Sequence, residues 1–193
     1  MGVTVMPMPV SFSKTEIDGV LEVKVGVIHD GRGFFSEVYS KPVWGGQGFT
    51  EPFLQDNMSL SVKGALRGMH YQLEPYAMGK FVRTLTGSAF DVAVDLRRGS
   101  PTFAKWVGRV LSGENGLALW IPAGFAHGFV ALEDNSVVYY KCTSVHVPES
   151  ERALSYKDPT VAISWPIEPT VVSEKDAVAP FLAQAEYNFV YHA

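Results

Sequence analysis

Side chains with the chemistry of a catalytic pocket are concentrated in one stretch of the chain, residues 55–72, which is otherwise typical of β-strand. Its first part, Gln55–Ser61, carries two amides, and its second part carries Arg67, His70 and Gln72. A histidine exchanges protons near neutral pH, whereas amides and guanidinium groups hold polar ligands by hydrogen bonds. Their repetition along neighbouring strands therefore favours a pocket that binds a polar ligand and moves a proton.

His70 is the candidate base. A catalytic base needs a partner that orients its second ring nitrogen, and a carboxylate distant in the sequence is the expected partner. The alternative is a hydrogen-bonded core histidine beside Gln72. Side chains alternate between the two faces of an extended strand. We therefore expect His70 and Gln72 on one face and Arg67 and Met69 on the other.

A cation and an acid follow later in the chain. Lys80 opens a strand after the loop 74–79 and is either a solvated strand-end lysine or a fixed cation beside a developing oxyanion. Tyr139 and Tyr140 are neighbours on one strand, so one of them should point inward and the other outward. An inward tyrosine is protonated at pH 7 and is a candidate general acid.

The segment 122–127 reads P-x-G-x-x-H, the second motif of the cupin superfamily. Metal-binding cupins combine its histidine, here His127, with an earlier H-x-H pair. Here that earlier position reads His70-Tyr71-Gln72 and lacks the second histidine. Two histidines without a carboxylate make a poor transition-metal site. We expect no metal and a hydrogen bond from His127 to substrate; a metal-dependent cupin that uses His70 and His127 is the alternative.

The segment 30–37 places Arg32, two phenylalanines and Glu37 close together. The guanidinium fork suits a diphosphate, and an aromatic ring can stack on a nucleobase. The alternative is a glycine-containing turn that leads into an edge strand.

Composition limits the class of protein. The 193 residues are 47% hydrophobic and 19% charged, with a net charge of −4, as expected for a single globular domain. The charge and the lack of a basic run argue against a nucleic-acid partner. No apolar run reaches the ~20 residues that span a membrane. Cys142 is the single cysteine, and no signal peptide is visible, so we expect a reducing, cytoplasmic location.

Short strands with close turn signals dominate the chain and predict an all-β sandwich or barrel. One of them, 89–96, alternates apolar and polar residues as a half-buried strand does. One helix is expected over 174–184, with Ser173 as its N-cap and Asp176 three residues later, as in a capping box. The predicted strands cover residues 19–28, 33–39, 81–85, 89–96, 105–111, 117–121, 125–132 and 136–144.

Seven motifs follow one another along the chain: D-x-R-G-F-F-x-E (30–37), Q-D-N-x-S-x-S (55–61), L-R-G-x-H-Y-Q (66–72), F-D-V-A-V-D-L-R-R-G-S-P-T-F (90–103), I-P-x-G-F-A-H-G-F (121–129), Y-K-C-T (140–143) and S-E-K-D (173–176). Taken together, these motifs resemble the dTDP-4-dehydrorhamnose 3,5-epimerase family from about residue 13 to 186. The resemblance implies a cupin-type jelly roll with a short C-terminal helix, one domain over 1–193, and a homodimer in which N-terminal strands are exchanged. It also implies that neither metal nor organic cofactor is needed.

The resemblance assigns a role to each matching residue. His70 is implied as the base, Asp176 as the carboxylate that orients it, Lys80 as the group facing the enolate oxygen and Tyr140 as the acid. The implied substrate contacts are Arg32, Glu37, Gln55, Asn57, Arg67, His127, Glu151 and Lys175.

The implied reaction is inversion of carbons 3 and 5 of a dTDP-linked 4-keto-6-deoxyglucose to give dTDP-4-keto-L-rhamnose. One alternative is a single-centre epimerase of a related keto-deoxysugar, and another is a module that only binds a sugar nucleotide. The chain departs from the family pattern in the loop 74–79, where Tyr76 and Met78 make the rim more apolar.

Overall fold

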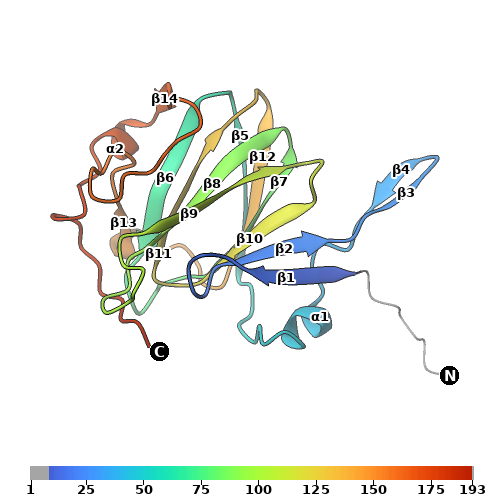
Figure 1. Cartoon of the computed structure of the whole chain (residues 1–193), viewed down its shortest axis with the longest axis horizontal. Helices are drawn as coiled ribbons and strands as arrows, with labels where there is room; N and C mark the ends of the chain where they lie inside the picture. Colours follow the sequence, from blue (N-terminus) through green and yellow to red (C-terminus); the bar gives the residue numbers. More distant parts are fainter. Residues whose placement is uncertain (1–8, 193) are drawn as a thin grey trace.

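Two sheets face each other in a sandwich (Figure 1), which confirms the prediction of an all-β fold. The computed structural model describes residues 9–192. The first sheet has the order β1 (Val10–Lys14), β2 (Leu21–Val25), β10 (Leu117–Ile121), β7 (Lys80–Thr86), β12 (Ser136–Cys142), β5 (Gln55–Ser61). The second has the order β13 (Glu151–Ala153), β6 (Ala65–Gln72), β11 (Phe125–Ala131), β8 (Ser88–Asp95), β9 (Trp106–Ser112), and β14 (Val171–Val172) pairs with β6. A short 3₁₀ turn, Pro148–Ser150, precedes β13.

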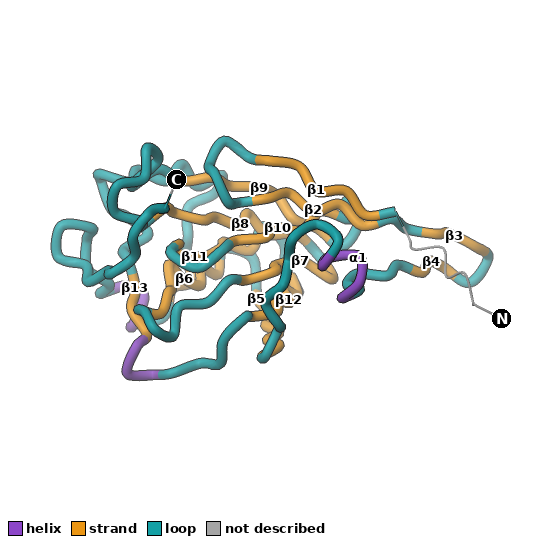
Figure 2. The backbone as a smooth tube through the Cα atoms, turned by 90° about the horizontal axis from the view of Figure 1, so that it is seen from below, coloured by secondary structure: helices purple, strands orange, loops and turns teal. Residues whose placement is uncertain are grey.

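Most predicted strands are present with ends shifted by one or two residues. The predicted strand 19–28 is instead divided at Gly26, whose N–H bonds the carbonyl of Pro9, so β2 ends and β3 (Ile28–Asp30) begins. The predicted strand 33–39 is regular only over β4 (Gly33–Phe35), which pairs with β3. These two strands form a hairpin that projects from the sandwich (Figures 1 and 2).

The prediction of a half-buried strand over 89–96 was wrong, because both faces of β8 are buried. Ala89 and Ala93 pack between the sheets, whereas Val92 and Val94 pack into a second cluster with the C-terminal segment. That segment, which supplies Leu154 to the second cluster, covers the face that would otherwise meet water. Two aspartates on the other face of β8, Asp91 and Asp95, are also fully buried.

The C-terminal helix is shorter than predicted. α2 spans Glu174–Ala177, and Ser173 Oγ accepts the Asp176 N–H at 3.2 Å, which confirms the N-cap. The predicted continuation to residue 184 was wrong because Pro180 lacks an N–H and disfavours helical geometry in the residue before it. None of the helices formed within residues 9–192 has the length and apolar character needed to cross a membrane.

A second short helix, α1 (Lys41–Gly45), was not predicted. Its Trp44 is 1% exposed and meets Phe81 edge to face at 4.5 Å between ring centroids. The helix and its flanking aromatic residues therefore cover part of the outer face of the first sheet.

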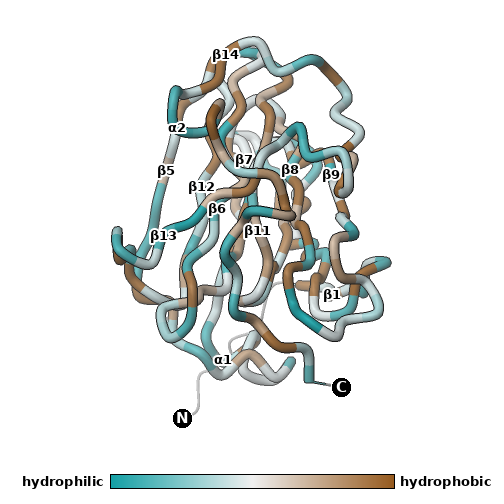
Figure 3. Tube along the Cα trace, turned by 90° about the vertical axis from the view of Figure 1, so that its left-hand side faces the viewer, coloured by the Kyte–Doolittle hydropathy of each residue, from teal (hydrophilic) through white to brown (hydrophobic). Residues whose placement is uncertain are grey.

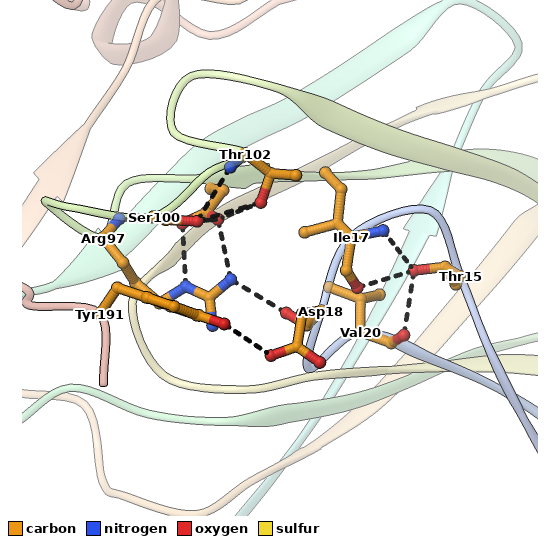
Figure 4. A network of polar contacts seen from close by, with 9 residues as sticks. Thr15, Ile17, Asp18, Val20, Arg97, Ser100, Thr102 and Tyr191 are labelled. Atoms are coloured by element: carbon orange, nitrogen blue, oxygen red, sulfur yellow. Dashed lines mark hydrogen bonds and ion pairs between the residues drawn. The ribbon is translucent and has the colours of Figure 1, made fainter. Parts of the chain in front are cut away.

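A network of polar contacts centred on Arg97 joins the chain just after β8 to two distant segments, at Asp18 and Tyr191 (Figure 4). Asp95 accepts hydrogen bonds from Arg97 and from the hydroxyls of Ser100 and Thr102, all at 2.6–2.9 Å. Arg97 in turn bonds the carbonyl of Asp18 and stacks on the ring of Tyr191. Burial raises the pKa of the Asp95 carboxyl, but these hydrogen bonds outweigh burial and hold the pKa below its usual value.

We expect Asp95→Asn to lower the free energy of unfolding by about 3 kcal/mol at pH 7, because it leaves the partly buried guanidinium without its counter-charge. Since the pKa of Asp95 is lower in the folded state, its contribution is present above the unfolded pKa of ~3.9 and is lost as the pH falls below it. Denaturant titrations of the wild type and of Asp95→Asn, at pH 7 and at acid pH, measure the difference in their free energies of unfolding. An equal difference at both pH values would contradict the account.

Candidate active site

A cavity of about 600 Å³ lies between the two sheets. β5, β7 and β12 of the first sheet line one side, and β6 and β11 of the second line the other. α2 and β14 lie together at one end of the molecule (Figure 3), and both contribute residues to the lining of the cavity. The predicted site residues among those that line it are Asn57, Arg67, His70, Lys80, His127, Tyr140, Lys175 and Asp176.

A smaller lobe of about 300 Å³ shares Asn57, His70, Lys80 and Tyr140 with the main cavity. It adds two further predicted residues, Gln55 and Glu151. Ten of the twelve predicted site residues therefore line one connected space.

Arg32 and Glu37 do not line either part of this space. Arg32 lies in the turn of the β3–β4 hairpin, where its side chain is 91% exposed and pairs with Asp30 at 2.6 Å. Glu37 follows the hairpin. Within one chain, the structure therefore does not bring these two residues to the cavity.

His70 and Asp176 form a close pair. His70 Nε2 lies 2.6 Å from Asp176 Oδ1, and the Gly68 N–H donates to Oδ2 at 3.4 Å. The backbone N–H of Asp176 donates to the N-cap Ser173, while its carboxylate, 5% exposed, turns to the histidine. Burial raises the pKa of Asp176, but the hydrogen bond and charge of His70 outweigh it, and the pKa is lowered overall. With Nε2 engaged, Nδ1 is the ring nitrogen left to accept a proton.

The strand β6 is irregular at Gly68, which brings Arg67 and His70 to the same cavity. Facing β11, the pairing register shifts between His127, opposite His70, and Phe129, opposite Arg67. Gly68 has φ +136°, and a Cβ there would collide with Gly128 Cα of β11. The prediction of strict alternation along 66–72 was therefore wrong, because an irregularity of this kind re-aims the side chains that follow it.

Lys80 and Tyr140 face the cavity from the first sheet. Lys80 is 9% exposed, so it is not a solvated strand-end lysine, and its Nζ donates to the His70 carbonyl at 3.3 Å. Burial lowers the pKa of Lys80 and raises the pKa of Tyr140, so the phenol remains protonated at neutral pH. Tyr139 points outward to Asp56, at 2.8 Å, which confirms that the two tyrosines face opposite ways.

A second histidine–carboxylate pair was missed by the sequence analysis. His127 Nε2 lies 2.9 Å from Oδ2 of Asp91, which is fully buried on β8. Burial is the main cause of a lowered pKa for His127, against the opposing charge of Asp91. The sequence did hold a clue, since Asp91 shares its face of the predicted strand with the apolar Ala93. The prediction of a half-buried strand nevertheless placed that face in solvent. Among residues 9–192, no group of three or more His, Cys, Asp and Glu side chains is arranged to hold a metal ion.

Polar side chains at the cavity wall hold one another in place. Gln55 Nε2 donates to Asn57 Oδ1 at 2.9 Å, and Arg67 Nε donates to Ser61 Oγ at 3.1 Å. Lys175 pairs with Glu151 at 2.6 Å, and this ion pair adjoins both lobes. Two cations, Arg67 and Lys175, therefore line the main cavity in addition to Lys80.

The comparison with protein families decides the relationship. Residues 14–184 match the model of the family described as dTDP-4-dehydrorhamnose 3,5-epimerase. The chain belongs to this family. A dTDP-4-dehydrorhamnose 3,5-epimerase of Shigella flexneri is 47% identical over 90% of this chain and 97% of its own length.

Solved structures of the epimerase family agree in fold. The crystal structure of a dTDP-6-deoxy-D-glucose-3,5-epimerase from Legionella pneumophila, in complex with dTDP-4-keto-L-rhamnose, is 44% identical with a TM-score of 0.91. It covers 96% of this chain and 100% of that one, which confirms the cupin-type fold. A 3'-monoepimerase from Streptomyces bikiniensis, in complex with dTDP-quinovose, is 34% identical with a TM-score of 0.83, over 89% and 87% of the two chains.

We expect Gly68→Ala to destabilise the protein by about 3 kcal/mol, because the added methyl group meets the β11 backbone at a φ that side chains disfavour. Gly45→Ala in α1 is the control, since nothing lies within 4 Å of a Cβ there, and it should be neutral or slightly stabilising. Urea titration of the two variants checks this. Equal stability of both would show that β6 does not need a glycine.

Proposed function

We propose that this chain is a dTDP-4-dehydrorhamnose 3,5-epimerase that inverts carbons 3 and 5 of dTDP-4-keto-6-deoxyglucose to give dTDP-4-keto-L-rhamnose. The observation that carries the proposal is the placement of a paired histidine and a tyrosine on opposite sheets. His70 extends from β6 in the second sheet and Tyr140 from β12 in the first, and both line one cavity. A sugar ring between them would meet a base on one face and an acid on the other.

In the proposed reaction, His70 Nδ1 removes the proton from carbon 3, and the C–H electrons form a C3–C4 double bond and an enolate oxygen. Tyr140 then donates its phenolic proton to the opposite face of carbon 3, so the centre is inverted. The tyrosinate regains a proton from water and the imidazolium loses one. The same steps at carbon 5 complete the double inversion, and Asp176 stabilises the imidazolium each time.

The enolate is the costly intermediate, and Lys80 is the group proposed to stabilise it. Because the lysine is buried, its charge acts in a medium of low dielectric constant, where it is worth more than in water. His127, held by Asp91, is proposed to contact the sugar nearby. The substrate's own ketone takes up the electrons, so the proposed mechanism needs no cofactor.

The nucleotide contacts are proposed from charge and hydrogen-bonding capacity. Arg67 and Lys175 are the cations suited to the diphosphate. Gln55, Asn57 and Glu151 supply amide and carboxylate groups for the remaining polar atoms. The single cysteine is buried and unpaired, which fits a reducing compartment, and we propose a cytoplasmic location.

Variants of the base and acid separate the two half-reactions. We expect His70→Ala to lower kcat by about 10³-fold or more, the upper part of the range for general acid–base catalysis. Tyr140→Phe should still exchange substrate protons with heavy water, because His70 returns a deuteron to the face it deprotonated, but it should not invert the centre. NMR of the substrate in D₂O measures both events. Full epimerisation by either variant would overturn the assigned roles.

We also propose a homodimer in which the β3–β4 hairpin reaches the cavity of the partner. The hairpin exposes Phe34 and Phe35, each 65% accessible, together with the side chain of Arg32, which is 91% exposed and paired with Asp30. The outer face of the first sheet exposes Met58 and Leu60, 71% and 61% accessible. Large apolar side chains gathered on a projecting arm and a sheet face are typical of surfaces that another chain covers. Such an exchange would supply Arg32 to a diphosphate in the partner's cavity.

Subunit complementation tests this arrangement. Arg32→Ala should raise KM, and His70→Ala should abolish turnover. In a co-expressed mixed dimer, the subunit that lacks Arg32 receives the arginine from its partner and has one intact site. Activity at low substrate concentration should therefore exceed the mean of the two separate variants. Activity equal to that mean would place Arg32 outside the partner's site.

A further inference from the structure

Gln72, at the end of β6, is buried but has no part in the proposed proton transfers. It is 4% exposed, and its amide makes three hydrogen bonds to the backbone of two loops. Nε2 donates to the carbonyls of Tyr76 at 2.7 Å and Val145 at 3.1 Å, and Oε1 accepts the Val147 N–H at 2.6 Å. One side chain therefore joins the loop before Lys80 to the loop after β12.

These two loops flank the smaller lobe of the cavity. Met78 lines the lobe from the first loop and His146 from the second, and Gln72 itself lies in the wall between them. Further contacts close the same junction: the Gly79 N–H donates to Thr143 Oγ1 at 2.8 Å, and the His146 N–H donates to Gln55 Oε1 at 2.8 Å.

The reacting groups are held by other contacts. Lys80 pairs in the sheet with Cys142 of β12, and His70 pairs with Asp176. Tyr140 lies between Asn57 and Val82 in the first sheet. None of these contacts involves Gln72, so a change at Gln72 moves the wall of the smaller lobe more than it moves the base, the cation or the acid.

We infer that Gln72 is a positioning residue that sets the width of the smaller lobe and thereby the affinity for the sugar nucleotide. A side chain that cannot bond both loops allows them to separate. The contacts between the smaller lobe and the sugar nucleotide are then weakened equally in the ground state and in the transition state. Such a loss raises KM and leaves kcat unchanged. The inference rests on the proposed epimerase function.

Two substitutions test Gln72. Gln72→Met removes all three hydrogen bonds at similar volume. Gln72→Glu keeps an acceptor for Val147 but sets a carboxylate oxygen against the carbonyls of Tyr76 and Val145. Each should raise KM for dTDP-4-keto-6-deoxyglucose by roughly tenfold, the effect of about 1.4 kcal/mol, with kcat within about threefold of wild type.

Asn115 is the matched control. Its amide also makes three hydrogen bonds to the backbone, with Ser112, Leu117 and Val110, but in the β9–β10 turn and outside both lobes. Asn115→Leu should lower the melting temperature and leave KM unchanged, as a purely structural role would. The decisive measurement is KM and kcat of the folded variants beside their melting temperatures.

The outcomes separate this inference from the proposed function. Wild-type protein without turnover would refute the function itself. Active wild type with a raised KM in both Gln72 variants supports the inference. Two results with an active wild type would overturn the inference. In the first, the Gln72 variants lose stability but keep KM, like Asn115→Leu. In the second, they lose kcat at constant KM. If Gln72→Met does not fold, Gln72→Glu alone decides between these results.

Discussion

The close approach of β6 and β11 is the constraint on which the site depends. At Gly68 the two backbones leave no room for a side chain, and the pairing register shifts there. Because of this shift, Arg67 and His70 both line the cavity, although a regular strand would send residues three apart to opposite faces. Asp176 bonds both the Gly68 N–H and His70, so one carboxylate links the irregular backbone to the proposed base.

The remaining charged groups of the site lie on well-paired strands. Asp91, Lys80 and His127 are buried, which costs desolvation free energy that stability alone would not favour. Each of these groups lies on a strand that is hydrogen-bonded to neighbours on both sides, which fixes its place in the sheet. Lys80, His127 and Tyr140 have pKa values shifted by burial and line one cavity, an arrangement typical of sites that move protons. The hairpin, in contrast, exposes Phe34 and Phe35, and we propose that a second copy of the chain covers it.

Local patterns in the sequence predict most of the strands, the N-cap Ser173 and the opposite orientation of Tyr139 and Tyr140. They do not predict what depends on tertiary contacts. The burial of Asp91 requires the first sheet to pack over the face of β8 that carries Ala89 and Ala93, and the shared face of Arg67 and His70 requires the backbone of β11. The resemblance supplied ten residues that line the cavity. Asp91 was assigned no role, and Gln72 was grouped with the ligand-binding amides, because their partners, His127 and the two loops, are distant in the sequence.

The central claim is that one base and one acid, on opposite sheets, invert two centres of a 4-keto sugar. The most direct test is to incubate the wild-type protein with dTDP-4-keto-6-deoxyglucose in heavy water and to follow carbons 3 and 5 by NMR. We expect deuterium at both carbons, with inversion at each. Deuterium at one carbon alone would identify a single-centre epimerase, and no exchange at either would contradict the account.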